Sequence, residues 1–177
     1  MPMTAPLLVR LGAHDRALML RCAIAPTASP RARLVWAGVT HLGGTRFSLL
    51  AAGLPWFACC ALHQASRLAL TLLVVSHLAV QIVKRNVVRC RPAEACGRQA
   101  LVREPDPFSF PSGHATAAMA VALGYSAVYP GWALPLLLLA LAVGVSRVRL
   151  GVHYPSDVLV GQLIAAATAA GVASLSP

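Results

Sequence analysis

Long apolar stretches, interrupted at few positions, dominate the chain after residue 45. Five of them approach the length that a helix needs to cross the hydrocarbon part of a bilayer. They cover residues 47–62, 68–83, 112–129, 132–145 and 158–175. The pattern therefore predicts an all-α fold, an integral membrane helical bundle with about five transmembrane helices.

Residues 1–45 differ from the rest because charges interrupt their apolar residues. Both 7–25 and 34–42 have this mixed pattern, with a Pro- and Ser-containing turn between them. Such a pattern is typical of amphipathic helices that lie at a membrane surface. We expect one domain over residues 1–177, in which 1–45 form an interfacial part and 46–177 form the transmembrane core.

Composition and charge narrow the class of partner. Hydrophobic residues make up 58% of the chain and charged residues only 11%, yet the formal net charge is +10. A basic balance often indicates nucleic acid, but aromatic residues are sparse and the long stretches are apolar. The charge is better explained by anionic lipid headgroups and a phosphate-bearing substrate, with the bilayer as the setting and no nucleic acid.

Arg147, His153 and Asp157 stand at the junction of the fourth and fifth apolar stretches. Pro155 suits the first turn of a new helix, which would set His153 and Asp157 about one turn apart. A carboxylate on one imidazole nitrogen fixes the tautomer and leaves the other nitrogen free to attack. The Arg147 fork fits phosphate oxygens. This junction is therefore a candidate phosphoryl-transfer centre.

Ser112, Gly113 and His114 open the third stretch. Ser112 is a plausible N-cap, and a helix N-terminus that follows a Gly can receive an anion on its backbone N–H groups. His114 then lies in the first turn and faces the same anion. We expect Ser112 and Gly113 to bind this anion.

Lys84 and Arg91 follow the second stretch at a spacing of seven residues. Seven residues are two helical turns, so we expect both cations on one helical face, with Pro92 ending the helix. When the five stretches cross in alternation, these cations, Ser112 and the Arg147–Asp157 junction all reach one membrane face.

Together the three motifs resemble the signature of the type 2 phosphatidic acid phosphatase superfamily. They read Lys-x6-Arg-Pro at 84–92, Pro-Ser-Gly-His at 111–114 and Ser-Arg-x5-His-x3-Asp at 146–157. The resemblance implies a small bacterial membrane enzyme, a metal-independent phosphatase of lipid phosphates that needs no cofactor. Its nucleophile would be His153, oriented by Asp157 and passing through a phosphohistidine, with His114 as general acid and then base.

The remaining motif positions would hold the phosphate. They are Lys84, Arg91, Ser112, Gly113 and Arg147. Three cations supply the charge that a metal ion supplies in other phosphoryl-transfer enzymes, and no Cys/His/Asp set has metal-ligand spacing. For Ser146, a structural role in capping or packing has as much support as a functional one.

The sequence does not select one substrate class. Phosphatidate, phosphatidylglycerophosphate, a polyprenyl phosphate or diphosphate of the undecaprenyl type, and a polyprenyl-phosphosugar phosphate all fit a site at a membrane face. Vanadate-dependent haloperoxidases share the signature but are larger and soluble. A non-catalytic lipid-phosphate binding or transport subunit is a further alternative, which the presence of both histidines disfavours.

The positive-inside rule bears on location. We expect a bacterial inner membrane protein in which Arg67 is the one basic residue on the face away from the site, and this favours a cytoplasmic site. An oxidising side would instead allow a short-loop disulfide between Cys90 and Cys96, for which an odd total of five cysteines argues little.

Several polar residues lie outside the motifs. We interpret Glu104 and Asp106 as solvated loop acids rather than partners of His114, and Arg85 and Arg89 as contacts to lipid phosphates.

Ser76, His77 and Gln81 form a polar cluster within the second stretch. Interhelical hydrogen bonding is our preferred interpretation of this cluster, and a role in lining a substrate path is the alternative.

Overall fold

The computed structural model describes residues 5–25, 27–58, 60–95, 101–102 and 106–175, and its regular structure is helical. The elements are α1 (Ala5–Cys22), α2 (Pro30–His41), α3 (Thr45–Gly53), η1 (Leu54–Phe57), η2 (Cys60–Leu62), α4 (His63–Asn86), α5 (Pro92–Ala95), α6 (Gly113–Val128), η3 (Pro130–Trp132), α7 (Ala133–Arg149) and α8 (Pro155–Leu175). Within these ranges the one extended pairing is an isolated antiparallel bridge between Cys90 and Phe108. The predicted all-α class is confirmed.

Local rules explain where several helices begin. Pro30 occupies the first turn of α2, and the Ser29 hydroxyl accepts a hydrogen bond from the Ala32 amide at 3.3 Å. Pro155 opens α8 in the way that its position in the sequence predicted. Gly151, in the turn between α7 and α8, has φ +71°, a left-handed conformation that glycine adopts without strain.

The first apolar stretch is not one continuous helix. α3 ends at Gly53, and two short 3₁₀ helices follow it before α4 begins. Gly53 favours a break, and Pro55 lacks the N–H that would continue an α-helix.

Three helical segments of the described chain are long and apolar enough to cross a membrane. They are α4, the continuous η3–α7 segment and α8. The third predicted span corresponds to α6, which has 16 residues. The membrane character is therefore confirmed, whereas the number of five spans stays a prediction.

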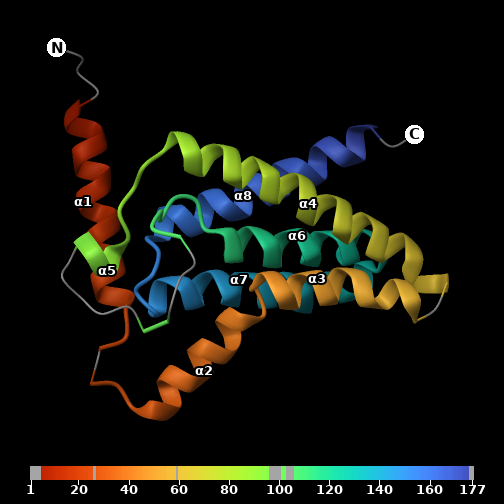
Figure 1. The fold of residues 1–177 in the computed structure, drawn as a ribbon, viewed down its shortest axis with the longest axis horizontal. Coiled ribbons are helices and arrows are strands. Elements are labelled where there is room, and N and C mark those ends of the chain that lie inside the picture. Colours follow the sequence, from red (N-terminus) through yellow and green to blue (C-terminus); the bar gives the residue numbers. More distant parts are fainter. Residues whose placement is uncertain (1–4, 26, 59, 96–100, 103–105, 176–177) are drawn as a thin grey trace.

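Helix α6 lies at the centre of a bundle with α4, α7 and α8 (Figure 1). Small residues permit this close packing. A Cβ on Gly124 would stand 2.5 Å from the Ala69 Cα of α4, and a Cβ on Gly161 of α8 would stand 2.7 Å from the Ser112 carbonyl oxygen. The backbones of α4 and α8 therefore approach α6 where only glycine fits.

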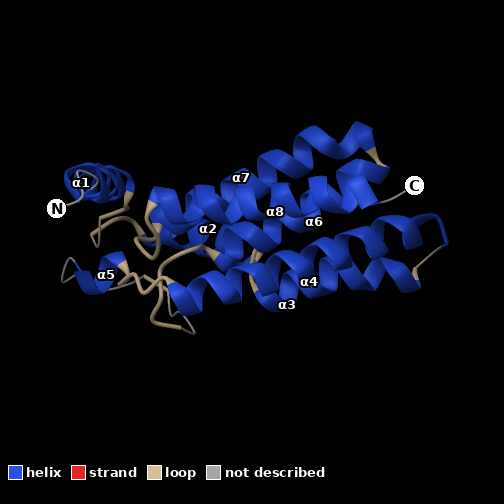
Figure 2. Cartoon of the chain, turned by 90° about the horizontal axis from the view of Figure 1, so that it is seen from above, coloured by secondary structure: helices blue, strands red, loops and turns tan. Residues whose placement is uncertain are grey.

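Four helix ends gather at one end of the bundle. α4 and α7 finish there, and α6 and α8 begin there, beside α1 and α5 (Figure 2). Because the three sequence motifs occupy these ends, the predicted threading brings them to one face, as expected.

Candidate active site

His153 precedes α8 by two residues and faces Asp157 in the first turn of that helix. The imidazole Nδ1 lies 3.5 Å from Asp157 Oδ2, and the side chains are 1% and 0% exposed. Nδ1 makes no hydrogen bond among the described residues, so its contact with Asp157 is an electrostatic one that orients the ring. The predicted pairing of the two residues is therefore present in the structure.

Three donors hold the Asp157 carboxylate in place. The Tyr154 amide donates to Oδ2 at 2.8 Å, the Ser109 hydroxyl also donates to Oδ2, and Arg89 Nη1 donates to Oδ1 at 2.6 Å. The Ser112 amide adds a bond to the Asp157 backbone carbonyl at 3.0 Å. A buried carboxylate with this many partners is stable as an anion at a fixed position.

Arg89 is a site residue that the sequence interpretation missed. Its Nη1 also donates to the Ser156 hydroxyl at 2.8 Å, and its guanidinium lies 4.0 Å from the centre of the Tyr154 ring. Its Nη2 lies 2.6 Å from Asp15 Oδ2. Assigning Arg89 to lipid phosphates was wrong, because the structure gives it two carboxylate partners within the protein.

Asp15 brings helix α1 into this network. Besides Arg89, it accepts a hydrogen bond from the Ser156 amide at 3.0 Å. Burial opposes the charge of Arg89, but the carboxylates of Asp15 and Asp157 outweigh it and raise the pKa of Arg89. The sequence contains one indication that Asp15 has a specific partner, because Asp15 is the sole acidic residue before Glu94.

Arg91 reaches the other side of the His153 ring. Its Nη1 lies 3.4 Å from His153 Nε2 and donates to the Val152 carbonyl at 3.1 Å. Because a guanidinium only donates, Nε2 is the acceptor nitrogen and the ring proton belongs on Nδ1, towards Asp157. The free electron pair of His153 therefore points at the cationic side of the site.

The predicted helical face for Lys84 and Arg91 was wrong. α4 ends at Asn86, and Arg91 follows an extended segment in which the Arg89 carbonyl accepts from the Ser109 amide at 2.8 Å. Pairing with the segment around Ser109 holds the chain after Asn86 in an extended conformation, so the helix does not continue to Arg91. Both cations are nevertheless buried beside one acid, Asp106.

Asp106 bridges these two cations. Its carboxylate lies 2.9 and 3.1 Å from Lys84 Nζ, and its Oδ1 lies 3.2 Å from Arg91 Nη2. Burial favours the neutral acid, but Lys84 and then Arg91 lower the pKa of Asp106 below its ordinary value. Our interpretation of Asp106 as a solvated loop acid was wrong; Glu104 and Cys96 lie outside the described residues.

The start of α6 presents a hydroxyl to the site. Ser112 takes the predicted N-cap position, yet its side chain makes no capping bond, and its buried Oγ has no hydrogen-bond partner among the described residues. Gly113 and His114 line the same cavity as Lys84 and His153. A Cβ on Gly44 would stand 3.8 Å from His114 Nε2, so His114 approaches the cavity from the side of α3.

Arg147 and Ser146 lie deeper in α7. Arg147 is fully buried, and its Nη1 donates to the Thr40 hydroxyl of α2 at 2.6 Å. The Ser146 hydroxyl donates to the Val143 carbonyl of its own helix at 2.6 Å, which is the structural role that we considered for it.

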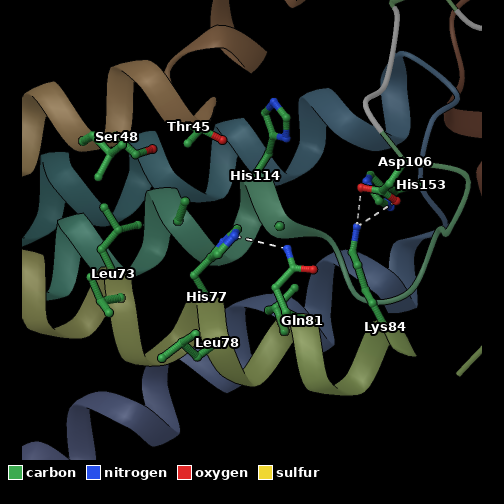
Figure 3. Close-up of a pocket in the computed structure, with 16 residues that line it drawn as sticks. Thr45, Ser48, Leu73, His77, Leu78, Gln81, Lys84, Asp106, His114 and His153 are labelled. Carbon is green, nitrogen blue, oxygen red and sulfur yellow. Dashed lines mark hydrogen bonds and ion pairs between the residues drawn. The ribbon is translucent and has the colours of Figure 1, made fainter. Parts of the chain in front are cut away.

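A cavity of about 360 Å³ is lined by five of the residues described above, which are Lys84, Asp106, Gly113, His114 and His153 (Figure 3). At one end it is lined by His153, His114, Lys84 and Asp106, and it continues along α3 and α4 past apolar side chains that include Leu49, Val74 and Leu78. An amphiphile would place a charged group at the first end and a hydrocarbon chain at the second.

The electrostatic setting keeps His153 neutral. Burial of the ring, followed by the charges of Arg147 and Arg91, lowers the pKa of His153 to about 4, although Asp157 favours the protonated form. A neutral imidazole with Nε2 unprotonated is the form that a nucleophile requires. Within the described ranges no group of three His, Cys, Asp or Glu residues could hold a metal ion.

The fold and the site define a membrane protein with buried cations, a buried imidazole and an adjoining cavity at one end of a helical bundle. Residues 64–177 match the PAP2 superfamily, and the chain belongs to that superfamily.

Two relatives and one solved structure extend this assignment. The chain is 41% identical over 101 residues to a decaprenylphosphoryl-5-phosphoribose phosphatase of Mycobacterium tuberculosis, covering 57% of this chain and 55% of that protein. It is 34% identical over 150 residues to phosphatidylglycerophosphatase B of Bacillus subtilis, covering 72% and 66%. The crystal structure of a transmembrane PAP2-type phosphatidylglycerolphosphate phosphatase from Bacillus subtilis shares the fold, with TM-score 0.70, 24% identity and coverage of 94% and 88%. The chain thus spans about half to two thirds of the length of these two curated relatives.

Proposed function

We propose that this protein is a membrane phosphatase that hydrolyses the phosphate monoester or diphosphate of a lipid through a phosphohistidine. The observation that carries the proposal is the contact of 3.4 Å between Arg91 Nη1 and His153 Nε2. It sets an acceptor nitrogen against a cation, and His153 lines a cavity that continues past apolar side chains. Relatives whose names describe lipid phosphatases support the same conclusion.

In the first step His153 Nε2 attacks phosphorus, and the bond to the leaving oxygen breaks. In-line displacement sets the nucleophile and the leaving group on opposite sides of phosphorus. His114, which lines the cavity from the side of α3, donates its proton to the leaving alkoxide. Lys84, Arg91 and Arg147, with the Ser112 hydroxyl and the Gly113 amide, stabilise the charge on the other oxygens.

In the second step water attacks the phosphohistidine. His114, now neutral, takes a proton from the water, the N–P bond breaks, and its electron pair returns to His153 Nε2. Inorganic phosphate leaves, and both histidines regain their starting states. Asp157 keeps the ring proton on Nδ1 throughout, by the contact of 3.5 Å described above.

The test is a phosphate-release screen of purified protein across phosphatidate, phosphatidylglycerophosphate, polyprenyl phosphates and diphosphates, and a polyprenyl-phosphosugar phosphate. EDTA is present in every assay, so that dependence on a divalent metal is measured together with activity. We expect release from at least one lipid and inhibition by vanadate. Binding of lipid phosphates without any release would instead identify a non-catalytic binding protein.

Two variants separate the roles of the histidines. His153→Ala should abolish both release and labelling of the protein by a phosphate donor. His114→Ala should still accept phosphate from p-nitrophenyl phosphate, because that leaving group needs no acid, but should retain the label. An unlabelled His114→Ala protein with normal turnover would contradict the phosphohistidine route.

For location, we propose a bacterial inner membrane with the site on the cytoplasmic side, supported by the distribution of basic residues. Cys90 near the site and Cys60 in η2, just before α4, are both exposed, so single-cysteine proteins make a matched pair. With an impermeant maleimide on intact cells, we expect Cys60 to react and Cys90 to react only after lysis. The reverse pattern would place the site outside.

A further inference from the structure

His77 and Gln81 lie on the cavity side of α4 and precede Lys84 along that helix. The Gln81 amide nitrogen is 3.2 Å from His77 Nε2, and both side chains line the cavity together with Lys84 (Figure 3). Spacings of three and four residues place the three on one helical face. With a rise of about 1.5 Å per residue, Gln81 lies about 4.5 Å and His77 about 10 Å along the helix from Lys84.

The opposite wall of the cavity is also polar at this level. Thr45 and Ser48 of α3 line it, and Figure 3 shows them across from His77 and Gln81. Ser48 is 1% exposed, and its hydroxyl has no hydrogen-bond partner among the described residues. A buried hydroxyl of this kind has a free energy cost that a bound ligand would remove.

We call Thr45, Ser48, His77 and Gln81 the polar collar. It differs from both ends of the cavity, because Lys84 follows it along α4 and the apolar residues Leu73 and Val74 precede it. Among the described residues that line the cavity, Lys84 is the sole Lys or Arg. The collar therefore offers hydrogen-bond donors and acceptors and contains no Lys or Arg that would bind a second phosphate.

Interhelical hydrogen bonding, our preferred interpretation of the polar cluster in the sequence, does not describe these contacts. His77 bonds to Gln81, and the Ser76 hydroxyl donates to the Leu73 carbonyl at 3.3 Å, both within α4. Polar groups within a membrane-spanning helix are costly and usually serve a ligand or a path. The structure favours the alternative, with His77 and Gln81 turned towards the cavity.

We propose that the polar collar binds a hydroxyl-bearing unit, a sugar or a glycerol, that carries the scissile phosphate of the lipid substrate. This inference rests on the proposed function and names its substrate class. Hydroxyl groups match the donors and acceptors of the collar, while the hydrocarbon chain follows the apolar wall. An alkyl phosphate would leave the collar unpaired, and an alkyl diphosphate would bring a second anion to it.

The test compares three single-chain lipids with the same hydrocarbon chain: an alkyl phosphate, an alkyl glucoside phosphate with the phosphate on the sugar, and lysophosphatidate, which has a free glycerol hydroxyl. For the wild-type protein we expect kcat/KM to be about tenfold or more higher for at least one hydroxylated lipid than for the alkyl phosphate. The better of the two hydroxylated lipids identifies the sugar or the glycerol as the source. Equal values for all three would overturn the proposal.

Variants assign the preference to the collar. Gln81→Leu and His77→Leu should bring the ratio close to one, chiefly by lowering kcat/KM for the hydroxylated lipids, and Ser48→Ala should lower the ratio severalfold. Thr71→Leu is the matched control, since Thr71 is exposed on α4 and its hydroxyl donates to the Arg67 carbonyl of the same helix. Variants that slow all three lipids equally would count against the collar.

A binding measurement separates this proposal from the proposed function. Native mass spectrometry of the His153→Ala protein compares occupancy by the alkyl glucoside phosphate and lysophosphatidate with occupancy by the alkyl phosphate. A preference for a hydroxylated lipid without hydrolysis by wild type would support the collar and reject the phosphatase. Hydrolysis of all three lipids with equal binding would reject the collar alone.

Discussion

Arg89 donates a hydrogen bond of 2.6 Å from Nη1 to Oδ1 of Asp157, the carboxylate that faces the His153 ring. The same guanidinium bonds to Asp15 on α1. The orientation of the proposed nucleophile thus depends on an arginine outside the family signature. Arg89 is a positioning residue, because its contacts reach His153 only through Asp157.

Replacing Arg89 by Gln should therefore lower kcat by about tenfold or more, because a buried carboxylate loses its charged partner. KM and inhibition by vanadate should change little, since Arg89 does not line the cavity. Arg89→Lys should restore part of kcat, and Arg85→Gln, at an exposed neighbouring position, is the control. A large rise in KM with kcat intact would contradict a positioning role.

Asp106 holds the two cations that we assign to phosphate binding. Its lowered pKa keeps the carboxylate charged at neutral pH, so it competes with an incoming anion. Asp106→Asn should lower the inhibition constant for vanadate by about tenfold, because one negative charge near the bound anion is removed. Asp106→Glu retains the negative charge, so its inhibition constant for vanadate should stay close to that of the wild-type protein. Weaker inhibition of Asp106→Asn would mean that the acid aligns the cations rather than competing for them.

His153 should remain neutral well below the usual range for histidine. Because its pKa is lowered to about 4, the unprotonated ring persists as pH falls through 6.5 and is lost only near pH 4. Titration of ¹⁵N-labelled histidine by NMR, with His153→Gln to assign the signal, measures this directly. A midpoint between pH 6 and 7 in the ligand-free protein would contradict the electrostatic description of the site.

Gly161 should be intolerant of even one methyl group. In Gly161→Ala the new Cβ would lie 2.7 Å from the Ser112 carbonyl and from Thr116 Oγ1, so α8 would move away from α6. We expect a loss of roughly 1–3 kcal/mol in stability and lower activity, since Ser112 is bonded to Asp157. Gly171→Ala, on the same helix with nothing within 4 Å, should be neutral or slightly stabilising. Equal melting temperatures for the two variants would exclude this packing argument.

Features set by neighbouring residues were predictable from the sequence. Pro155 and Ser112 mark helix starts by their own backbone chemistry, and the short separation of His153 and Asp157 around the start of α8 brings them together. The gathering of the motifs at one face followed from counting apolar stretches. These predictions needed only local rules.

The features that the sequence interpretation missed are contacts between distant segments. Arg89 and Asp15 are 74 residues apart, and no periodic pattern links them. Arg91 leaves the helical face of Lys84 because the chain after Asn86 pairs with the segment around Ser109. Asp106 has the composition of a loop acid, and its role is visible only once Lys84 and Arg91 stand on either side of it.

The bond between Asp15 and Arg89 has a consequence for how relatives of this chain are compared. The family match begins at residue 64, yet a carboxylate from residue 15 neutralises the arginine behind the nucleophile. A protein can therefore retain every signature position, Asp157 included, and still lack the second carboxylate that partners this arginine. An inventory of the signature alone would count such a protein as intact, and its missing acid would be found only by inspecting the amino-terminal helix.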